Sequence, residues 1–135
     1  MPLTKNRDTK ERINRDFNAP VAAAKIIYQG ALVALDTSGN LTPGATATTL
    51  KGAGRAKKKV DNASGSAGDV TAPYEKGTFL FANSAGADEI TRAEIGDNCY
   101  IVDDETVAKT DGSSSRSVAG VVADIETSGV WVTFA

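Results

Sequence analysis

The sequence has 135 residues and a net charge of −2, which predicts one domain without general affinity for nucleic acid, because proteins that bind polyanions carry a basic surplus. It contains no histidine and one cysteine, Cys99, which excludes Ser–His–Asp and Cys–His catalytic groups, a zinc site and an internal disulfide. No segment approaches the roughly 18 apolar residues that span a bilayer, so we expect a soluble protein with no membrane contact, no cofactor and no bound metal.

Residues 1–20 differ in composition from the rest of the chain. Cationic side chains alternate with acidic ones, and apolar side chains are sparse. Ordering a backbone costs about 1–2 kcal/mol per residue, which so few apolar groups do not offset. We therefore predict an extended N-terminal arm that becomes ordered on a partner, with a tail that has no partner as the alternative. The residues expected to bind that partner are Leu3, Arg7, Arg12, Ile13, Arg15 and Phe17.

Residues 21–135 are predicted to form a single all-β domain. Short apolar runs alternate with turn signals at a spacing of about ten residues, which is typical of a compact small β-sandwich or barrel. Residues 36–40 form a predicted turn, in which Asp36 bonds its own backbone and Gly39 supplies a positive φ. Apart from two similar Thr-Ser-Gly turns, we find no internal repeat. In chain order, strands are expected within 25–35, 50–60, 78–82 and 99–102.

A cationic stretch, Arg55 with Lys57, Lys58 and Lys59, lies in the middle of this acidic chain. If residues 52–60 are one strand, alternate side chains face opposite ways, which places Arg55, Lys57 and Lys59 together on one side. We expect that side to be a solvated strand face. The alternatives are a basic stripe that faces a partner and a phosphate-binding surface, although no aromatic platform interleaves with the lysines to favour the second.

The last third of the chain offers an acidic run, a thiol and one tryptophan. A hairpin turn explains the run Asp103–Glu105 better than a divalent-cation site does, because the spacing of a calcium-binding loop is missing. Cys99 is predicted to point inward as a small apolar residue. Trp131 is predicted to be a core residue, with an interface anchor as the alternative. The chain is expected to end in a hairpin that joins 118–125 to 130–134.

Four segments together resemble a known family. They are KIIYQGALVALDTSGNLTPGATATTLKGAGRA, the VDNASGSAGD loop, GTFLFANSAGADEITRAEIGDNCYIVDDETVAKTDG and SVAGVVADIETSGVWVTF. The chain resembles small structural proteins of Mu-like and related tailed phages and prophages, and in outline the capsid decoration, or cement, proteins of tailed phages. The likeness covers nearly the whole chain from about Val21, and it lies in the ordered series of strands and turns.

The resemblance implies a β-rich domain, assembled as a homotrimer, on the outer capsid surface of the virion where major capsid protein subunits meet. Such proteins often use an N-terminal arm to add a strand or clasp to the capsid lattice, which would give residues 1–20 their role. The resemblance also implies synthesis in the host bacterial cytoplasm and partners that are the major capsid protein and other copies of the chain, with no nucleic acid.

Two other function classes remain open at this stage. The first is a small β-barrel head-completion or tail component that acts as a protein-binding module through the cationic face 52–59. The second is a carboxylate hydrolase that uses Asp103 or Asp104, for which the sequence offers little support. We therefore expect a structural protein that is not an enzyme.

Overall fold

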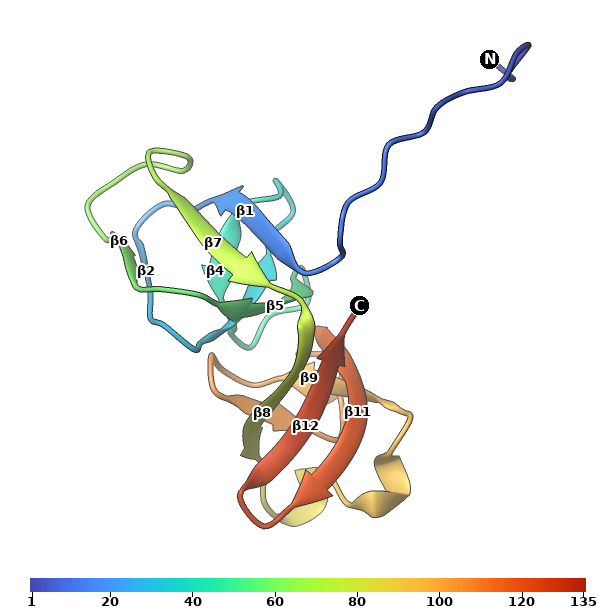
Figure 1. Ribbon diagram of the computed structural model, residues 1–135. Coiled ribbons are helices and arrows are strands. Elements are labelled where there is room, and N and C mark those ends of the chain that lie inside the picture. Colours follow the sequence, from blue (N-terminus) through green and yellow to red (C-terminus); the bar gives the residue numbers. More distant parts are fainter.

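Strands and two short 3-10 turns make up the regular structure of the computed structural model, which describes residues 1–135 (Figure 1). The all-β class and the barrel predicted from the sequence are confirmed. No helix of the chain has both the length and the apolar character needed to cross a lipid bilayer. The strands of the first half are β1 Asp16–Pro20, β2 Lys25–Ile27, β3 Leu32–Leu35, β4 Leu41–Pro43, β5 Lys51–Ala56, β6 Val60–Asn62 and β7 Thr71–Glu75. The second half contains β8 Gly77–Asn83, η1 Gly86–Asp88, η2 Arg92–Glu94, β9 Asn98–Ile101, β10 Thr106–Ala108, β11 Val118–Glu126 and β12 Gly129–Phe134.

The second half is a closed barrel with the strand order β10-β8-β12-β11-β9, called here the C-terminal barrel. Strand β10 runs parallel to β8, and every other pair in the barrel is antiparallel. Alternate side chains of β8 and β12 point inward, which buries Phe79, Phe81, Val130, Val132 and Phe134. The predicted strand at 78–82 and the predicted C-terminal hairpin are therefore confirmed.

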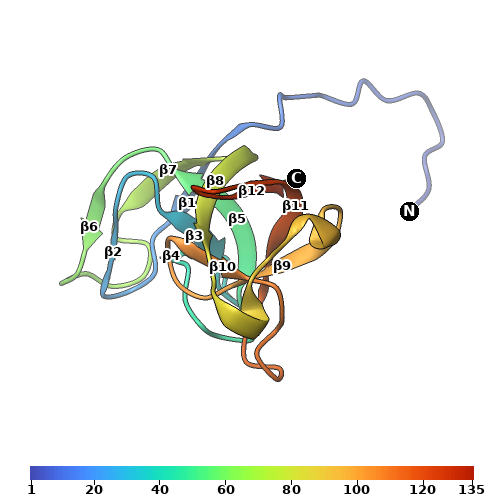
Figure 2. The same cartoon turned by 90° about the horizontal axis from the view of Figure 1, so that it is seen from below.

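The first half is a five-stranded antiparallel sheet with the order β1-β7-β5-β3-β4, called here the N-terminal sheet. The sheet curls back on itself, because Val21, directly after β1, bridges in parallel to Leu41 of β4 and the Ala22 amide donates to the Leu41 carbonyl. Its interior forms a core of its own around residues such as Val33 and Tyr74. A separate two-stranded ribbon, β2-β6, extends from this half (Figure 2).

The two halves have the same strand order and directions. In the order of the chain, β1, β3, β4, β5 and β7 correspond to β8, β9, β10, β11 and β12. The residue pairings correspond as well: Phe17 pairs with Tyr74 as Phe79 pairs with Val132, and Leu41 lies beside Val21 as Val107 lies beside Asn83. The structure thus contains an internal repeat that the amino-acid sequence does not reveal.

The repeat includes a β-bulge at the same place in each half. The register of β3 with β5 shifts beside Ala53, and the register of β9 with β11 shifts beside Ala119. Each bulged alanine is buried and is followed by a glycine, Gly54 or Gly120. An added Cβ at Gly54 would lie 2.1 Å from the carbonyl oxygen of Glu75, and one at Gly120 would lie 2.4 Å from that of Thr133, so both strands approach a neighbour too closely for a side chain.

The bulged strands β5 and β11 also join the two halves. An added Cβ at Gly52 of β5 would lie only 1.9 Å from the Ala119 carbonyl oxygen of β11. The Leu50 amide donates to Ser117 Oγ at 3.0 Å, and the Leu32 amide donates to the Asp104 carbonyl at 2.8 Å. Leu32 is buried in the core of the C-terminal barrel, so the halves share backbone bonds and side-chain packing.

Two sequence-based boundaries differ from the structure. The body begins at Asp16 and not at Val21, because Phe17 and Ala19 of β1 pack on the core of the N-terminal sheet. The segment 50–60 is two strands and not one, because β5 ends at Ala56 and the chain bends before β6. The bulge at Ala53 breaks the period of two, so Ala53 and Ala56 both face the core.

We predict that Gly52→Ala destabilises the whole molecule by about 1–3 kcal/mol, because the new methyl group would overlap the Ala119 carbonyl. The free energy of unfolding in urea, followed by circular dichroism, measures the effect. The control is Lys51→Ala at the exposed neighbouring position, for which a change below about 0.5 kcal/mol is expected. Equal stability of Gly52→Ala and the parent would contradict the close approach of β5 and β11.

Candidate functional site: the arm and its attachment

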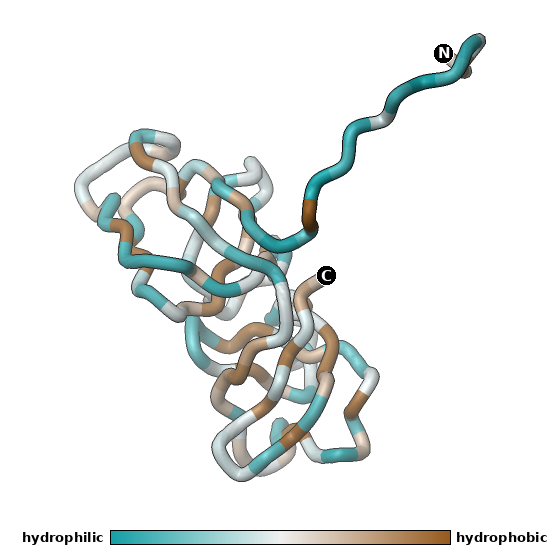
Figure 3. The backbone as a smooth tube through the Cα atoms, viewed as in Figure 1, coloured by the Kyte–Doolittle hydropathy of each residue, from teal (hydrophilic) through white to brown (hydrophobic).

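The most distinctive feature of the surface is the arm, defined from here as residues 1–14. It contains no strand and extends away from both halves of the body (Figure 1, Figure 2). Its residues are hydrophilic along most of its length (Figure 3), and its two large aliphatic residues are open to solvent, Leu3 at 72% and Ile13 at 84% exposure. Largely exposed aliphatic groups on an extended segment are favourable to bury, so contact with another molecule would stabilise them.

The arm also differs from the body in charge. With Arg15, residues 1–15 carry five cationic and two acidic side chains, a net charge of +3, whereas the remaining residues carry a net charge of −5. Arg7 and Arg12 are exposed, and the Arg12 guanidinium lies 4.5 Å from the centre of the Phe17 ring. The arm therefore presents an attractive surface to acidic partners, and salt should weaken that attraction.

The root of the arm is held on the N-terminal sheet by Phe17. Its ring stacks on the ring of Tyr74 in β7, with the centroids 5.6 Å apart. The Lys76 ammonium lies 5.1 Å from the Phe17 centroid, so two cations, Arg12 from the arm and Lys76 after β7, interact with this ring. The pKa of Tyr74 is raised by burial. Phe17, which the sequence predicts to bind a partner, is partly buried and packs against Tyr74 within this chain.

A buried carboxylate completes the root. Glu75, the last residue of β7, is 5% exposed and accepts hydrogen bonds from the Nε and Nη2 atoms of Arg55 in β5. Arg15 forms an ion pair with the other oxygen of the same carboxylate at 3.0 Å. The hydrogen bond from Arg55, strengthened by the charges of Arg55 and Arg15, holds the pKa of Glu75 below its usual range. Glu75 thus joins the end of the arm to the centre of the sheet.

A second ion pair lies beside the first. Lys57 Nζ donates to the Asp16 carboxylate at 2.9 Å, and this hydrogen bond lowers the pKa of Asp16. Both side chains are exposed, so the pair adds little to stability. Together with the Glu75 cluster, it means that Arg15, Arg55 and Lys57 all have carboxylate partners within the chain.

The prediction that Arg55, Lys57 and Lys59 lie together on one solvated strand face is therefore wrong. Arg55 lies on β5 and is turned towards Glu75 and the Phe79 ring, 4.1 Å away. Lys57, Lys58 and Lys59 are exposed in the bend between β5 and β6. Lys59 lies 5.4 Å from the ring of Tyr28, a residue that the sequence analysis did not single out and that is 54% exposed.

The remaining sequence-based sites fall in the C-terminal barrel. Asp103–Glu105 form the predicted turn between β9 and β10, in which Asp103 Oδ1 accepts the Glu105 amide. Cys99 is buried as predicted, and burial raises its pKa to about 11, which leaves an unreactive thiol. Trp131 is not a core residue: its neighbours Val130 and Val132 point inward, and Trp131 is half-buried on the outer face.

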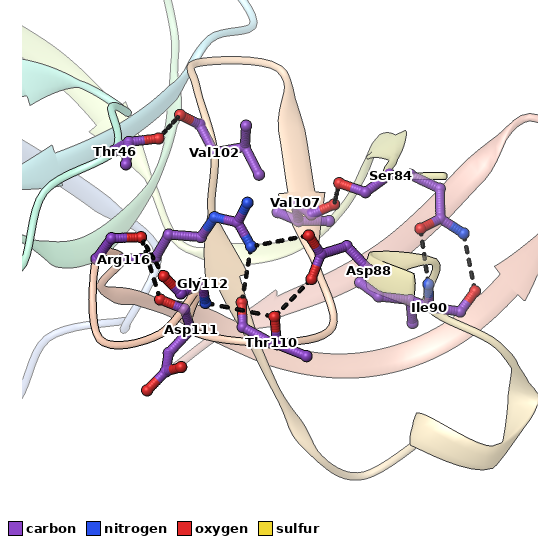
Figure 4. Close-up of polar contacts among 12 residues, drawn as sticks. Thr46, Ser84, Asp88, Ile90, Val102, Val107, Thr110, Asp111, Gly112 and Arg116 are labelled. Atoms are coloured by element: carbon purple, nitrogen blue, oxygen red, sulfur yellow. Dashed lines mark hydrogen bonds and ion pairs between the residues drawn. The ribbon is translucent and has the colours of Figure 1, made fainter. Parts of the chain in front are cut away.

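The loop that follows β10 is fixed by one arginine. Arg116 donates to the Thr110 carbonyl at 3.1 Å and pairs with Asp88 of η1 at 3.3 Å, while Thr110 also donates to Asp88 (Figure 4). These bonds, with the one from Thr110 first, lower the pKa of Asp88. The Nε atom of Arg116 is buried without a hydrogen-bond partner, while the other polar contacts of this cluster hold the barrel rim together.

Comparisons with protein-family models, with curated proteins and with solved structures find no match to this chain.

We predict that Glu75→Gln loosens the root of the arm and lowers the free energy of unfolding near pH 7 by about 1–3 kcal/mol, because the buried anion between two arginines is lost. Since the pKa of Glu75 is lowered in the folded state, its contribution is complete above the unfolded value near 4.5 and disappears as the pH falls through the folded value. Urea unfolding at several pH values between about 2 and 7 measures both effects.

The control is Glu105→Gln, which changes the same charge at an exposed turn position without an ion pair. The parent and the control should lose stability together as the solution is acidified, while Glu75→Gln should show a smaller loss. Parallel pH profiles for the parent and Glu75→Gln would contradict the assignment.

Proposed function

We propose that this protein is a structural decoration, or cement, protein of a tailed-phage head, which binds the outer surface of the assembled capsid and stabilises contacts between major capsid protein subunits. The observation that carries the proposal is the arm, a cationic, extended segment that leaves the body with its aliphatic groups exposed while its root is fixed by Glu75. The family resemblance of the segments from Val21 onward supports the same class of protein.

In this proposal the arm acts as a clasp on the capsid lattice. Leu3 and Ile13 enter apolar pockets, because both are exposed on the free protein. Arg7 and Arg12 pair with capsid carboxylates, because both are exposed and neither forms an ion pair within the chain. The backbone of the arm pairs with a strand edge of the capsid protein, which supplies the hydrogen bonds that water supplies before binding. Arg15 and Phe17 hold the root in place and do not contact the capsid.

Stabilisation of the shell follows from mass action. A protein that binds the closed lattice better than it binds separate subunits shifts the equilibrium towards the closed shell. We propose that the protein acts as a homotrimer, because three linked arms raise the effective concentration of each arm once the first has bound. The net charge of −5 on the body repels packaged DNA, which favours the outer capsid surface after synthesis in the host bacterial cytoplasm.

The second candidate function is a head-completion or tail component that acts as a protein-binding module. The observation in its favour is the exposed group of Lys58, Lys59 and Tyr28, which offers a compact basic and aromatic surface on the body. The number of copies per particle separates the two functions, since a cement protein coats the shell in hundreds of copies and a completion protein occurs in a handful.

We predict that removing residues 2–14 abolishes capsid binding without unfolding the body. The deletion keeps Arg15 and β1, so the ion pair with Glu75 and the stacking on Tyr74 remain. Binding is measured by sedimentation of the protein with empty capsids of its phage, and folding by circular dichroism and thermal unfolding.

Two matched variants sharpen the test. Leu3→Ser/Ile13→Ser keeps the charge of the arm and removes its aliphatic groups, and we expect it to bind weakly. Arg7→Gln/Arg12→Gln keeps those groups, and we expect its remaining binding to depend less on salt than that of the parent. A truncated protein that coats capsids to the same extent as the parent would rule out the clasp.

A further inference from the structure

Three strands of the C-terminal barrel, β8, β12 and β11, lie side by side (Figure 1). Their outer face includes exposed apolar side chains. Leu80 lies opposite Trp131, and Val121 lies opposite Thr133 on the neighbouring strand pair. Leu80 is 37% exposed and Val121 is 39% exposed, while Trp131 is half-buried between the strands. These three residues are called the apolar face.

The internal repeat shows that the fold does not require large aliphatic or aromatic side chains at these positions. The residues of the N-terminal sheet with the same pairings are Asn18 in place of Leu80, Arg55 in place of Val121 and Pro73 in place of Trp131. Both halves fold with the same register, although only one has an aliphatic and aromatic outer face. The apolar face therefore has a use outside the stability of its own barrel.

Charge indicates what covers this face. Residues 77–135 carry ten acidic and three cationic side chains, a net charge of −7, whereas residues 1–76 carry seven acidic and twelve cationic side chains, a net charge of +5. Near the apolar face, Asp124 lies opposite Trp131, Glu126 lies at the end of β11 and the Asp97 carbonyl accepts the Val122 amide. Arg92, paired with Asp124 at 3.2 Å, is the cation beside them. An occupant that carries both lysines and an apolar group fits this rim.

The N-terminal half of the chain supplies such a surface. Lys57, Lys58 and Lys59 are exposed in the bend after β5, and Lys58 and Lys59 form no ion pair within the chain. Beside them lies the ring of Tyr28, exposed at 54% and in contact range of Lys59. Tyr28, Lys58 and Lys59 are called the lysine–tyrosine patch. Its aromatic ring matches the apolar face, and its two free cations match the acidic rim.

We propose that the apolar face of one copy docks on the lysine–tyrosine patch of a second copy. The two surfaces lie on different halves of the chain, so the contact is head-to-tail, and an open assembly keeps one free surface of each kind at its two ends until it closes. A head-to-tail contact that closes after a few copies yields a ring, which includes the homotrimer of the proposed function. As a route to the homotrimer the contact rests on the proposed function, but it uses neither the arm nor a capsid, so a failure of the contact and a failure of capsid binding can be told apart.

Sedimentation velocity of the full-length protein tests the contact without any partner. The parent should associate in a concentration-dependent manner in about 0.05 M salt and dissociate towards the monomer in about 1 M salt, because the Debye length falls from about 14 Å to about 3 Å. A parent that stays monomeric at millimolar concentration in low salt would overturn the proposal, as would association that salt does not weaken.

Two variants with single damaged surfaces identify the faces. Lys58→Glu/Lys59→Glu damages the patch, and Leu80→Glu damages the apolar face; all three positions are exposed, and circular dichroism checks the fold. Each variant alone should be monomeric under conditions in which the parent associates. An equimolar mixture should form a 1:1 dimer that grows no further, because one intact face meets one intact patch and the two damaged surfaces repel each other.

The matched control is Lys25→Glu/Lys51→Glu, which makes the same change in charge at exposed lysines outside both the patch and the arm and should associate as the parent does. Association of either damaged variant at the level of the parent would overturn the proposal. A mixture that stays monomeric would also overturn it, because it would show that the contact is not head-to-tail. Capsid sedimentation of the same variants reports on the proposed function separately, since their arms are unchanged.

Discussion

The position of the arm depends on one buried anion, the carboxylate of Glu75. Burying an unpaired carboxylate is costly, so the group needs cations, and it finds them on two different segments, Arg55 in the sheet and Arg15 at the end of the arm. The Arg55 guanidinium also lies against the Phe79 ring of the C-terminal barrel. This one carboxylate therefore acts with the pairing of β1 and β7 and the stacking of Phe17 on Tyr74 to fix the direction in which the arm leaves the body, and it links that direction to both halves of the molecule.

The two halves show which features of this fold are interchangeable. Where the backbones of neighbouring strands approach closely, the same solution appears twice: a buried alanine in a bulge, followed by Gly54 or Gly120. Away from those contacts the two halves diverge, with a ribbon of β2 and β6 in one and two 3-10 turns in the other. The outer faces diverge most in charge and polarity, so one architecture supplies two chemically different surfaces on one chain.

Local patterns in the sequence predicted the elements whose stability is local. The alternation in residues 77–83 and in the closing hairpin follows directly from side chains that alternate between core and solvent. The turns at Asp36 and at Asp103 form as predicted, because each carboxylate accepts a backbone amide two residues ahead. The all-β class followed from these short elements, whereas their order in two repeated sheets did not, since it depends on pairings distant in the sequence.

The candidate site was harder to predict for the same reason. Strand β1 has charged neighbours and a terminal proline, and its partners, Tyr74 and Glu75, lie nearly sixty residues further along the chain. No window of sequence around Phe17 contains them, so the segment resembled the arm that precedes it. The bulge at Ala53 is likewise invisible in the sequence, and it turns Ala53 to the core side of β5. Arg55 stays on the outer side, where its carboxylate partner Glu75 lies twenty residues further along the chain.

A fixed root changes the energetics of the arm. Ordering residues 1–14 costs roughly 15–30 kcal/mol of conformational free energy. Leu3 and Ile13 return only about 1.5–3 kcal/mol each on burial, so aliphatic pockets alone do not hold the arm. Backbone hydrogen bonds along an extended pairing and ion pairs with the arginines must supply the remaining free energy. The body must also be bound to the partner already, so that the arm loses no further translational freedom. The composition of the arm thus favours a partner that offers a strand edge bordered by carboxylates.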